Sequence, residues 1–465
     1  STDAMQTPVP SELTAKLQLA YPEHASRILA ALDSAPSVSI RLHPARTLTT
    51  PPHAELRDGA IPWLPAELEG YWLSERPTFA LDPLWHAGAY YVQDASAMTL
   101  ATIWEQLDWH TPPSLALDLC AAPGGKSTLL RDLLPEGTLL VSNEILPKRC
   151  KILVENLVKW CGADQMIITQ EDPQRLTPLL HGACDLILVD APCSGEGLMR
   201  RDEEARRMWS PQLVSDCVTR QRAILQEAMH MLAPEGILLY ATCTLNQEEN
   251  DQMVQWLLDH YPCELIDLSR SAERIAGAYA TSYGLHLWPG IVRGEGQYLA
   301  ALRLTDIVET PSESRKAKGL TRTSRQELAG LTWLSETTSA DYYTIGERIY
   351  QLTPEAAQLV ATAYRERLAI ATPGLEIASM RHQAKGYEPS FALLHHKLYD
   401  AVKLPALELP LQEALRYLRG EALTTETPTE RGITVITYRD IPLGLAHSTG
   451  TRLNNLYPKP YRLRI

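Results

Sequence analysis

The sequence predicts an α/β protein whose central part holds a parallel sheet covered by helices on both faces, and three observations support this. Short apolar runs alternate with long amphipathic stretches between residues 115 and about 305, an alternation typical of parallel sheets. A glycine-rich turn within LDLCAAPGGKST, residues 117–128, joins the first apolar run to an amphipathic stretch. Polar residues, two cysteines among them, end two later apolar runs, at the edge where open parallel sheets bind ligands.

The first half of this pattern predicts two strand–helix units. The apolar run LALDLC at 115–120 predicts a strand, and KSTLLRDLL at 126–134 predicts the helix after the glycine turn. TLLVSNE at 138–144 predicts the next strand. The stretch 147–161 has apolar residues at helical spacing and predicts the second helix.

The second half continues in the same order. MIIT at 166–169 and DLILVD at 185–190 predict strands. A long helix is expected over 210–232, because it opens with Ser-Pro, a strong helix start. GILLYATC at 236–243 predicts another strand, and 246–261 predicts a helix with acids in its first turn.

Composition divides the 465 residues around this core. Residues 1–95 mix an amphipathic opening with proline-rich loops and are expected to form an N-terminal segment. The core is expected over 96–305. Residues 306–327 are polar and basic with few large apolar residues, which predicts a linker. A second region with apolar patterning, 328–465, follows it.

The charge distribution restricts how the chain can bind nucleic acid. A net charge of −13 disfavours binding over the whole surface, because carboxylates repel phosphates. Any RNA partner must therefore use local basic patches. One candidate is SRKAKGLTRTSR at 314–325, and the other is the tail 431–465, whose cations are Arg431, Arg439, Arg452, Lys459, Arg462 and Arg464 against the single acid Asp440.

The cysteine pattern and the hydropathy exclude several other classes. The eight cysteines include no CxxC pair, so neither a disulfide framework nor a zinc cluster is expected. Reduced thiols in a cytoplasmic protein without a metal fit this usage. There is no run of 18 apolar residues and no secretory leader in the sequence, so no membrane association is expected.

The glycine turn predicts a ligand site at the start of a helix. Gly124 and Gly125 allow close approach of a ligand to the backbone, and free N–H groups at the helix start can bind an anion. A nucleotide phosphate and a carboxylate-bearing nucleoside both suit such a site. The phosphate-loop pattern G-x-x-x-x-G-K-[ST] matches at Gly125, Lys126 and Ser127, but Cys120 stands where its first glycine is required.

Two acids after the next strands favour the nucleoside. Glu144 ends the second strand, about 20 residues after the glycine turn, where a carboxylate can bind both ribose hydroxyls. Asp172 follows the third strand and could accept from an adenine amino group. Each could instead simply cap a helix. Together with the glycine turn, the two acids favour a nucleoside cofactor without phosphates, and S-adenosylmethionine fits this description.

Cys193 and Cys243 each follow an apolar strand at the ligand edge of the predicted sheet. Cytosine C5 is a weak nucleophile, but a thiolate that adds to C6 converts the ring into an enamine whose C5 can attack a methyl group. Asp190, just before Cys193 in the sequence, could hold the base at N3 and N4. These residue patterns predict covalent methylation of a cytosine but do not decide which thiol adds to the ring.

The sequence contains the blocks LDLCAAPGGKS, NE at 143–144, VDAPCSGEG and YATCTLNQEEN in this order. Through these blocks it shows a resemblance to the Sun/nucleolar-protein family of RNA 5-methylcytosine methyltransferases. The resemblance extends to SIRLHPAR, GAYYVQDASAM and HLWPGIVRGEGQYLAALRL, where Tyr298 stands at a position often occupied by Phe. The stretches ALRYLRGE and IPLGLAHSTGTRLNNLYPKPYRLR are similar to the bacterial RsmF-type branch, which methylates small-subunit ribosomal RNA.

This resemblance implies a Rossmann-like seven-stranded methyltransferase core, an N-terminal RNA-contact segment and a C-terminal PUA-like part at about 372–465. It implies that Cys243 is the nucleophile and that Cys193 assists release of the adduct. The stretch QEDPQRL lacks the Asp-Gly-Arg that this branch often shows near Asp172. The implied S-adenosylmethionine site comprises Cys120, Ala121, Ala122, Pro123, Gly124, Gly125, Lys126, Glu144, Asp172 and Asp190.

The leading hypothesis is therefore S-adenosylmethionine-dependent methylation of cytosine C5 in RNA, with 16S ribosomal RNA or the 30S subunit as the expected substrate and a monomer as the expected form. A transfer-RNA cytosine methyltransferase is the alternative within the same class. An ATP-driven RNA-binding protein that uses 120–127 as a phosphate loop is the alternative from another class. A non-catalytic RNA-binding protein is disfavoured by the two thiols.

Overall fold

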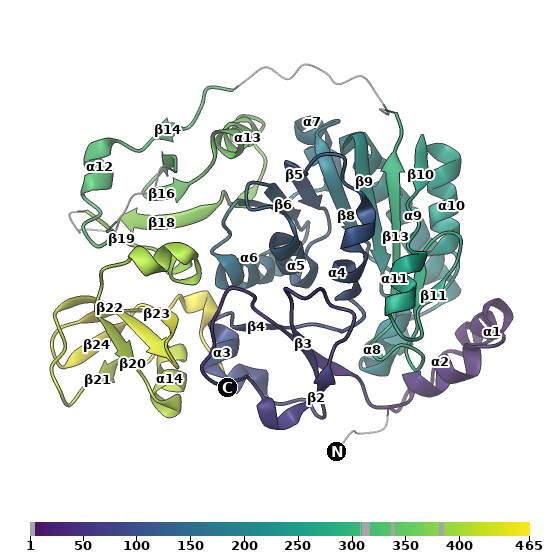
Figure 1. The fold of residues 1–465 in the computed structure, drawn as a ribbon, viewed down its shortest axis with the longest axis horizontal. Coiled ribbons are helices and arrows are strands. Elements are labelled where there is room, and N and C mark those ends of the chain that lie inside the picture. Colours follow the sequence, from purple (N-terminus) through teal and green to yellow (C-terminus); the bar gives the residue numbers. More distant parts are fainter. Residues whose placement is uncertain (1–4, 307, 309–316, 336–339, 381–385) are drawn as a thin grey trace.

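The computed structural model describes residues 5–306, 308, 317–335, 340–380 and 386–465. Figure 1 shows a central sheet flanked by helices, with the N-terminal helices on one side and two further sheets from the C-terminal region on the other. No helix in these described ranges is long and apolar enough to cross a membrane.

The N-terminal segment forms two helices and a small sheet. The helices are α1 (Ser11–Ala20) and α2 (Ala25–Leu32). The sheet has the antiparallel order β2-β3-β1-β4. Its strands are β1 (Val38–Leu42), β2 (Arg57–Ala60), β3 (Gly70–Leu73) and β4 (Tyr90–Val92), and the short helices α3 (Pro83–His86) and α4 (Thr99–Ile103) lie before and after β4 in the chain.

The central sheet has ten strands in the order β11-β12-β13-β9-β8-β5-β6-β7-β17, with β10 paired to β13. The neighbours β7, β6, β5, β8 and β9 run parallel, and β13 is antiparallel to β9. The strands are β5 (Leu115–Asp118), β6 (Leu139–Asn143), β7 (Met166–Thr169), β8 (Cys184–Asp190), β9 (Leu232–Thr242), β10 (Cys263–Leu265), β11 (Tyr279–Ala280), β12 (Leu285–Leu287), β13 (Gln297–Leu304) and β17 (Ile370–Thr372).

This sheet confirms the Rossmann-like fold class and adds to the predicted strand number. Seven consecutive strands, from β7 through β5 to β12, form the expected core. The additional strands β10, β11 and β17 are two or three residues long. Strands this short carry no readable period-two pattern, which is why the sequence did not predict them.

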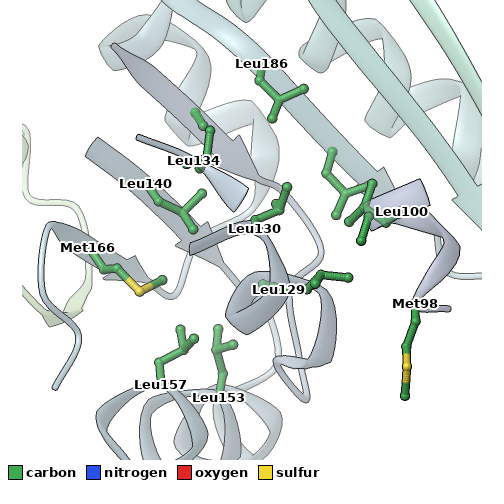
Figure 2. Close-up of a cluster of buried hydrophobic side chains, with 14 of the residues drawn as sticks. Met98, Leu100, Leu129, Leu130, Leu134, Leu140, Leu153, Leu157, Met166 and Leu186 are labelled. Atoms are coloured by element: carbon green, nitrogen blue, oxygen red, sulfur yellow. The ribbon is translucent and has the colours of Figure 1, made fainter. Parts of the chain in front are cut away.

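Helices cover both faces of the central sheet. Ala116 and Leu140 belong to one buried cluster, whereas their neighbours Leu117 and Val141 belong to the other, as the period of two in a strand requires. Figure 2 shows the first cluster, in which leucines of α5 and α6 pack beneath β6 and β7. The core helices are α5 (Gly125–Leu133), α6 (Pro147–Cys161), α7 (Pro173–Leu180), α8 (Glu203–Met208), α9 (Pro211–Met231), α10 (Asp251–His260) and α11 (Ser269–Arg274).

One predicted helix begins later than expected. The pattern predicted a helix over 246–261, but α10 begins at Asp251. Residues 246–250 form a turn in which the side chains of Asn246, Glu249 and Asn250 are buried. The prediction of this helix start was wrong because the polar side chains bond to neighbouring loops instead of facing water.

The C-terminal region contains two antiparallel-rich sheets, ordered β14-β15-β16-β18-β19 and β20-β22-β23-β24-β21. Strand β17 pairs with β7, and His396 Nε2 lies 2.8 Å from Asp164 Oδ2, so this region contacts the core. The elements are β14 (Thr321–Arg322), α12 (Arg325–Ala329), β15 (Tyr342–Ile345), β16 (Arg348–Gln351), α13 (Pro354–Arg365), β18 (Leu375–Met380), β19 (Tyr387–Pro389), β20 (Ala406–Glu408), α14 (Leu411–Leu418), β21 (Leu423–Thr424), β22 (Gly432–Tyr438), β23 (Ile441–Ser448) and β24 (Arg452–Asn455).

The segment predicted as a basic linker, 306–327, lies partly outside the described residues, because 307 and 309–316 are not among them. Its described end pairs with the following sheet through β14 and β15.

Candidate active site

The glycine turn lies between β5 and α5, at the carboxyl edge of the central sheet. Gly124 has a φ of 119°, a conformation that glycine adopts without strain, and a Cβ there would lie 3.3 Å from Leu153 Cδ1. Helix α6 holds the turn from outside, because Arg149 donates to the Ala122 carbonyl at 2.9 Å and Asn156 donates to the Pro123 carbonyl at 2.7 Å. The turn therefore keeps a fixed shape with an open helix start beside it.

The buried carboxyl group of Asp118 also stabilises this turn. Asp118, the last residue of β5, is fully buried and accepts from Ser127 Oγ of α5 at 2.6 Å. Burial raises the pKa of Asp118 to about 7, although the Ser127 hydrogen bond acts in the opposite direction. This contact ties the strand before the turn to the helix after it.

The N-terminal segment also contacts the turn. The buried Arg41 of β1 donates to the Gly125 carbonyl at 3.2 Å and to Gln93 Oε1 at 2.9 Å. Arg41 lies in the stretch SIRLHPAR, but no local sequence pattern predicts that its guanidinium reaches α5. The N-terminal segment thus helps to place the proposed cofactor site.

The two predicted nucleoside acids lie in different surroundings. Glu144 follows β6, is only 5% exposed, and accepts from the backbone N–H of Leu146 at 3.0 Å. Asp172 is exposed and caps α7, accepting from the Gln174 N–H at 3.0 Å. Both follow neighbouring strands at the carboxyl edge, and the buried Asn143 joins these strand ends through hydrogen bonds to Leu119 and Glu171.

Asp190 forms an ion pair across this edge. It ends β8, and its Oδ2 lies 2.9 Å from Nζ of Lys126 on α5. Burial alone would lower the pKa of the Lys126 ammonium, but Asp190, with a smaller contribution from Cys243, raises it above its usual value. Lys126 and Asp190 therefore form an ion pair at the edge of the sheet that carries the glycine turn.

The structure brings the two predicted thiols together. Cys193 and Cys243 lie on the loops after β8 and β9, both are free, and their sulfurs are 3.1 Å apart. The hydrogen bond with Cys243, followed by burial, raises the pKa of Cys193 well above its usual value. The two sulfurs are thus within hydrogen-bond distance, and either one can be the donor.

The loops that carry the two thiols also contain two buried carboxylates that the sequence analysis did not single out. Glu196 accepts from the backbone N–H groups of Leu245 and Asn246, and Glu249 accepts from the N–H of Ser194. Both side chains are fully buried. The only signal in the sequence was the unusual density of acids after each cysteine, which is equally typical of an exposed helix start.

The order β7-β6-β5-β8-β9-β13-β12, the glycine turn after β5 and the acid after β6 define a methyltransferase with a Rossmann-like sheet. Comparison with known sequences then defines the family. The chain is 32% identical over 425 residues to ribosomal RNA small subunit methyltransferase F of Klebsiella pneumoniae, covering 86% of this chain and 83% of that protein. The protein belongs to this methyltransferase family.

Other comparisons agree with this assignment. The protein of the same name from Cronobacter sakazakii is 32% identical, with 86% and 83% of the two chains covered. Family models match at 9–95 for the N-terminal domain of 16S rRNA methyltransferase RsmF, at 109–303 for 16S rRNA methyltransferase RsmB/F, and at 404–463 for the methyltransferase RsmF PUA domain. The predicted family and the predicted PUA-like domain are thereby confirmed.

A solved structure supports the fold. The methyltransferase homolog protein from Pyrococcus horikoshii has a TM-score of 0.53 and 25% identity to this chain, covering 63% of this chain and 95% of that one. The protein is thus an RNA methyltransferase, and the alternative of an ATP-driven RNA-binding protein is not supported.

Proposed function

We propose that this protein transfers a methyl group from S-adenosylmethionine to C5 of a cytosine in 16S ribosomal RNA, through a covalent intermediate with Cys243. The observation that carries the proposal is the meeting of the Cys193 and Cys243 sulfurs, 3.1 Å apart, at the edge of the sheet where the glycine turn and the Lys126–Asp190 pair also lie. Methylation of a nitrogen or oxygen would require neither thiol.

The residues after β5 and β6 fit S-adenosylmethionine. Ala121 and Ala122 are small and buried, and the start of α5 offers backbone N–H groups to the carboxylate of the cofactor. The Glu144 carboxylate suits the ribose hydroxyls. Asp172 would accept from the adenine amino group in addition to capping α7. The remaining proposed contacts come from Cys120, Pro123, Gly124, Gly125, Lys126 and Asp190. When bound, the cofactor supplies an electrophilic methyl group.

The chain's own groups would act on the base in sequence. Asp190 would accept from the N4 amino group of the cytosine, and from N3 when that nitrogen carries a proton. The Cys243 thiolate would form a bond to C6, which makes C5 nucleophilic. The Lys126 ammonium, 2.9 Å from Asp190, would keep that carboxylate in place beside the base.

Release requires a base, such as water, to take the C5 proton. The electron pair of the C5–H bond then re-forms the C5–C6 double bond as the bond between C6 and the Cys243 sulfur breaks. The Cys193 sulfur lies 3.1 Å from that of Cys243, within hydrogen-bond reach of the departing sulfur. We propose that this thiol assists the departure by hydrogen bonding to the developing thiolate. The family resemblance supports the same assignment of the two roles.

The substrate proposal rests on the named relatives and on the C-terminal surface. Both relatives are named for the small-subunit ribosomal RNA. Arg431, Arg439, Arg452, Lys459 and Arg464 are exposed in or beside the PUA match, where they can bind phosphates. We propose assembled 30S subunits or their RNA as the substrate, rather than transfer RNA. We also propose a monomeric, cytoplasmic enzyme; the free thiols are typical of the cytoplasm. The thiol mechanism requires no metal.

Bisulfite sequencing of ribosomal and transfer RNA tests this function. A strain that lacks the gene should lose one or more 5-methylcytosines from 16S RNA. The wild-type gene should restore them, and a gene encoding Cys243→Ala should not. Loss of methylation from a transfer RNA alone would contradict the substrate proposal.

A further inference from the structure

Each of the two loops that carry the thiols has a carboxylate that accepts hydrogen bonds from the backbone of the other loop. Glu196, on the Cys193 loop, accepts from the backbone N–H of Leu245 at 2.9 Å and of Asn246 at 2.8 Å. Glu249, on the Cys243 loop, accepts from the backbone N–H of Ser194 at 2.9 Å. Each carboxylate thus binds backbone N–H groups within three residues after the other loop's cysteine. We call these two reciprocal contacts the carboxylate clasp.

Further donors surround the clasp. Trp209 Nε1 donates to Glu196 at 2.8 Å, Gln221 Nε2 donates to Glu249 at 2.9 Å, and Asn246 Nδ2 donates to both carboxylates. Because neither carboxylate is exposed, each depends on these donors to offset the cost of burying a charge. Hydrogen bonds to a charged acceptor are also stronger than those between neutral groups. The clasp is therefore a strong and specific connection between the loops.

Two neutral contacts join the loops still closer to the thiols. Ser194 Oγ lies 2.8 Å from Thr244 Oγ1, and the Gly197 N–H donates to the Cys243 carbonyl at 2.9 Å. A Cβ on Gly197 would lie 2.5 Å from that carbonyl oxygen, so the approach requires glycine. Ser194, which follows Cys193, is therefore hydrogen-bonded to Thr244, which follows Cys243.

We propose that Glu196 and Glu249 are positioning residues that set the distance and orientation of the two thiols. This inference rests on the proposed roles of Cys243 and Cys193. Glu196 orders the backbone that follows Cys243, so it controls addition to the base. Glu249 orders the backbone that follows Cys193, so it controls release of the adduct.

Replacement of each Glu by Gln separates these two roles. In Glu249→Gln, an amide nitrogen, which cannot accept a hydrogen bond, replaces one of the two carboxylate oxygens. The donors of Ser194, Gln221 and Asn246 then have only one acceptor oxygen on this side chain. The Cys193 loop loosens, while Glu196 still holds the backbone after Cys243. In Glu196→Gln, the Cys243 loop loosens instead. Glu248→Gln is the matched control, because the Glu248 side chain points to Lys16 at 2.8 Å and not to the clasp.

The first measurement follows thiol geometry without catalysis. The full-length protein is treated with a diazene oxidant such as diamide, which takes up two electrons and two protons as the two thiols form one disulfide. Mass spectrometry of alkylated peptides gives the rate at which Cys193 and Cys243 become linked. Either Gln variant should slow this reaction about tenfold or more, since a misplacement of ~1 Å can cost about 100-fold in rate. Rates equal to wild type and Glu248→Gln would overturn the clasp.

The second measurement follows the covalent adduct with ribosomal RNA from the deletion strain and S-adenosylmethionine. On denaturing gels, Glu249→Gln should accumulate an RNA–protein species, and Glu196→Gln should form less of it than wild type. The reverse pattern would overturn the division of roles. If Cys193→Ala traps RNA while both Gln variants match wild type in both assays, the clasp is wrong and the proposed function stands.

If neither cysteine variant traps RNA, the proposed function fails, and the linking rate alone decides whether the clasp sets the thiol geometry.

Thermal unfolding checks that each variant is folded. Should Glu249→Gln not fold, Thr244→Val carries the linking test, because it removes only the hydroxyl that bonds to Ser194, Glu196 and Asn246. It should slow linking by a smaller factor. An unchanged rate would exclude a role of the Thr244 hydroxyl in thiol geometry, and the clasp is then decided by the linking rate of Glu196→Gln.

Discussion

The Glu144 carboxylate lies at the carboxyl end of β6, almost fully buried, with the backbone N–H of Leu146 as its nearest donor. If it holds the ribose hydroxyls, Glu144→Ala should weaken S-adenosylmethionine binding by roughly 1.5–3 kcal/mol, the usual worth of hydrogen bonds to a charged group. Isothermal titration calorimetry measures this affinity. The exposed Asp172 provides a comparison, because Asp172→Asn should weaken binding less. Unchanged affinity in Glu144→Ala would count against the site.

The thiols and the glycine turn could be predicted from the sequence, because each follows an apolar run directly. The partners of these residues could not. From their neighbours in the sequence, Glu196 and Glu249 would be predicted to lie in exposed turns. Their contacts depend on two loops that meet only when β8 and β9 pair. The Lys126–Asp190 ion pair likewise joins residues from different strand–helix units.

The β5–turn–α5 element contains a titratable contact that makes its stability depend on pH. Burial raises the pKa of Asp118 to about 7 from an ordinary value of 3.8. The folded chain therefore keeps a proton that the unfolded chain releases as the pH rises. The resulting stabilisation is complete below about pH 4 and is lost as the pH rises through about 7.

Asp118→Asn should remove this dependence, because an amide does not titrate and its carbonyl oxygen can still accept from Ser127. Between about pH 5 and about pH 8, the variant's free energy of unfolding should fall less than that of wild type. Urea unfolding at a series of pH values measures both. Parallel curves for the two proteins would contradict the assignment.

Element boundaries show where local pattern stops being informative. The long helix α9 starts where Ser210 and Pro211 predict, because an N-cap signal is local. Helix α10 starts later than its acids suggest, because Asn246 and Glu249 bond to the Cys193 loop and leave the helix without a regular first turn. The short strand β17 pairs with β7 although it lies far from it in the sequence, and no local pattern encodes that pairing.

At the scale of the whole molecule, the acidic chain must bring RNA to one edge of its central sheet. The exposed cations of the C-terminal region are the proposed source of this attraction. Replacing Arg431, Arg452 and Lys459 by Gln should weaken RNA binding and lower its salt dependence, by about 0.7 in the slope of log K against log salt for each lost phosphate contact. Filter binding at several salt concentrations measures both. Arg365→Gln, an exposed cation of α13, should change neither.

If the triple variant keeps the wild-type slope, the C-terminal cations do not contact RNA.

The PUA match at 404–463 agrees with the predicted C-terminal module. The separate sheet β14-β15-β16-β18-β19 was not expected, because apolar patterning over 328–465 does not show how the strands divide between two sheets.

The central claim is that one thiol bonds to the base and the other helps to release it. The most direct measurement is denaturing gel electrophoresis of the full-length protein after reaction with target RNA and S-adenosylmethionine. Cys243→Ala should be inactive and form no adduct, because nothing attacks C6. Cys193→Ala should accumulate a stable RNA–protein species, because addition and methyl transfer proceed while release is slowed. An adduct in Cys243→Ala but not in Cys193→Ala would reverse the two roles, and active variants that both fail to trap RNA would contradict the covalent mechanism.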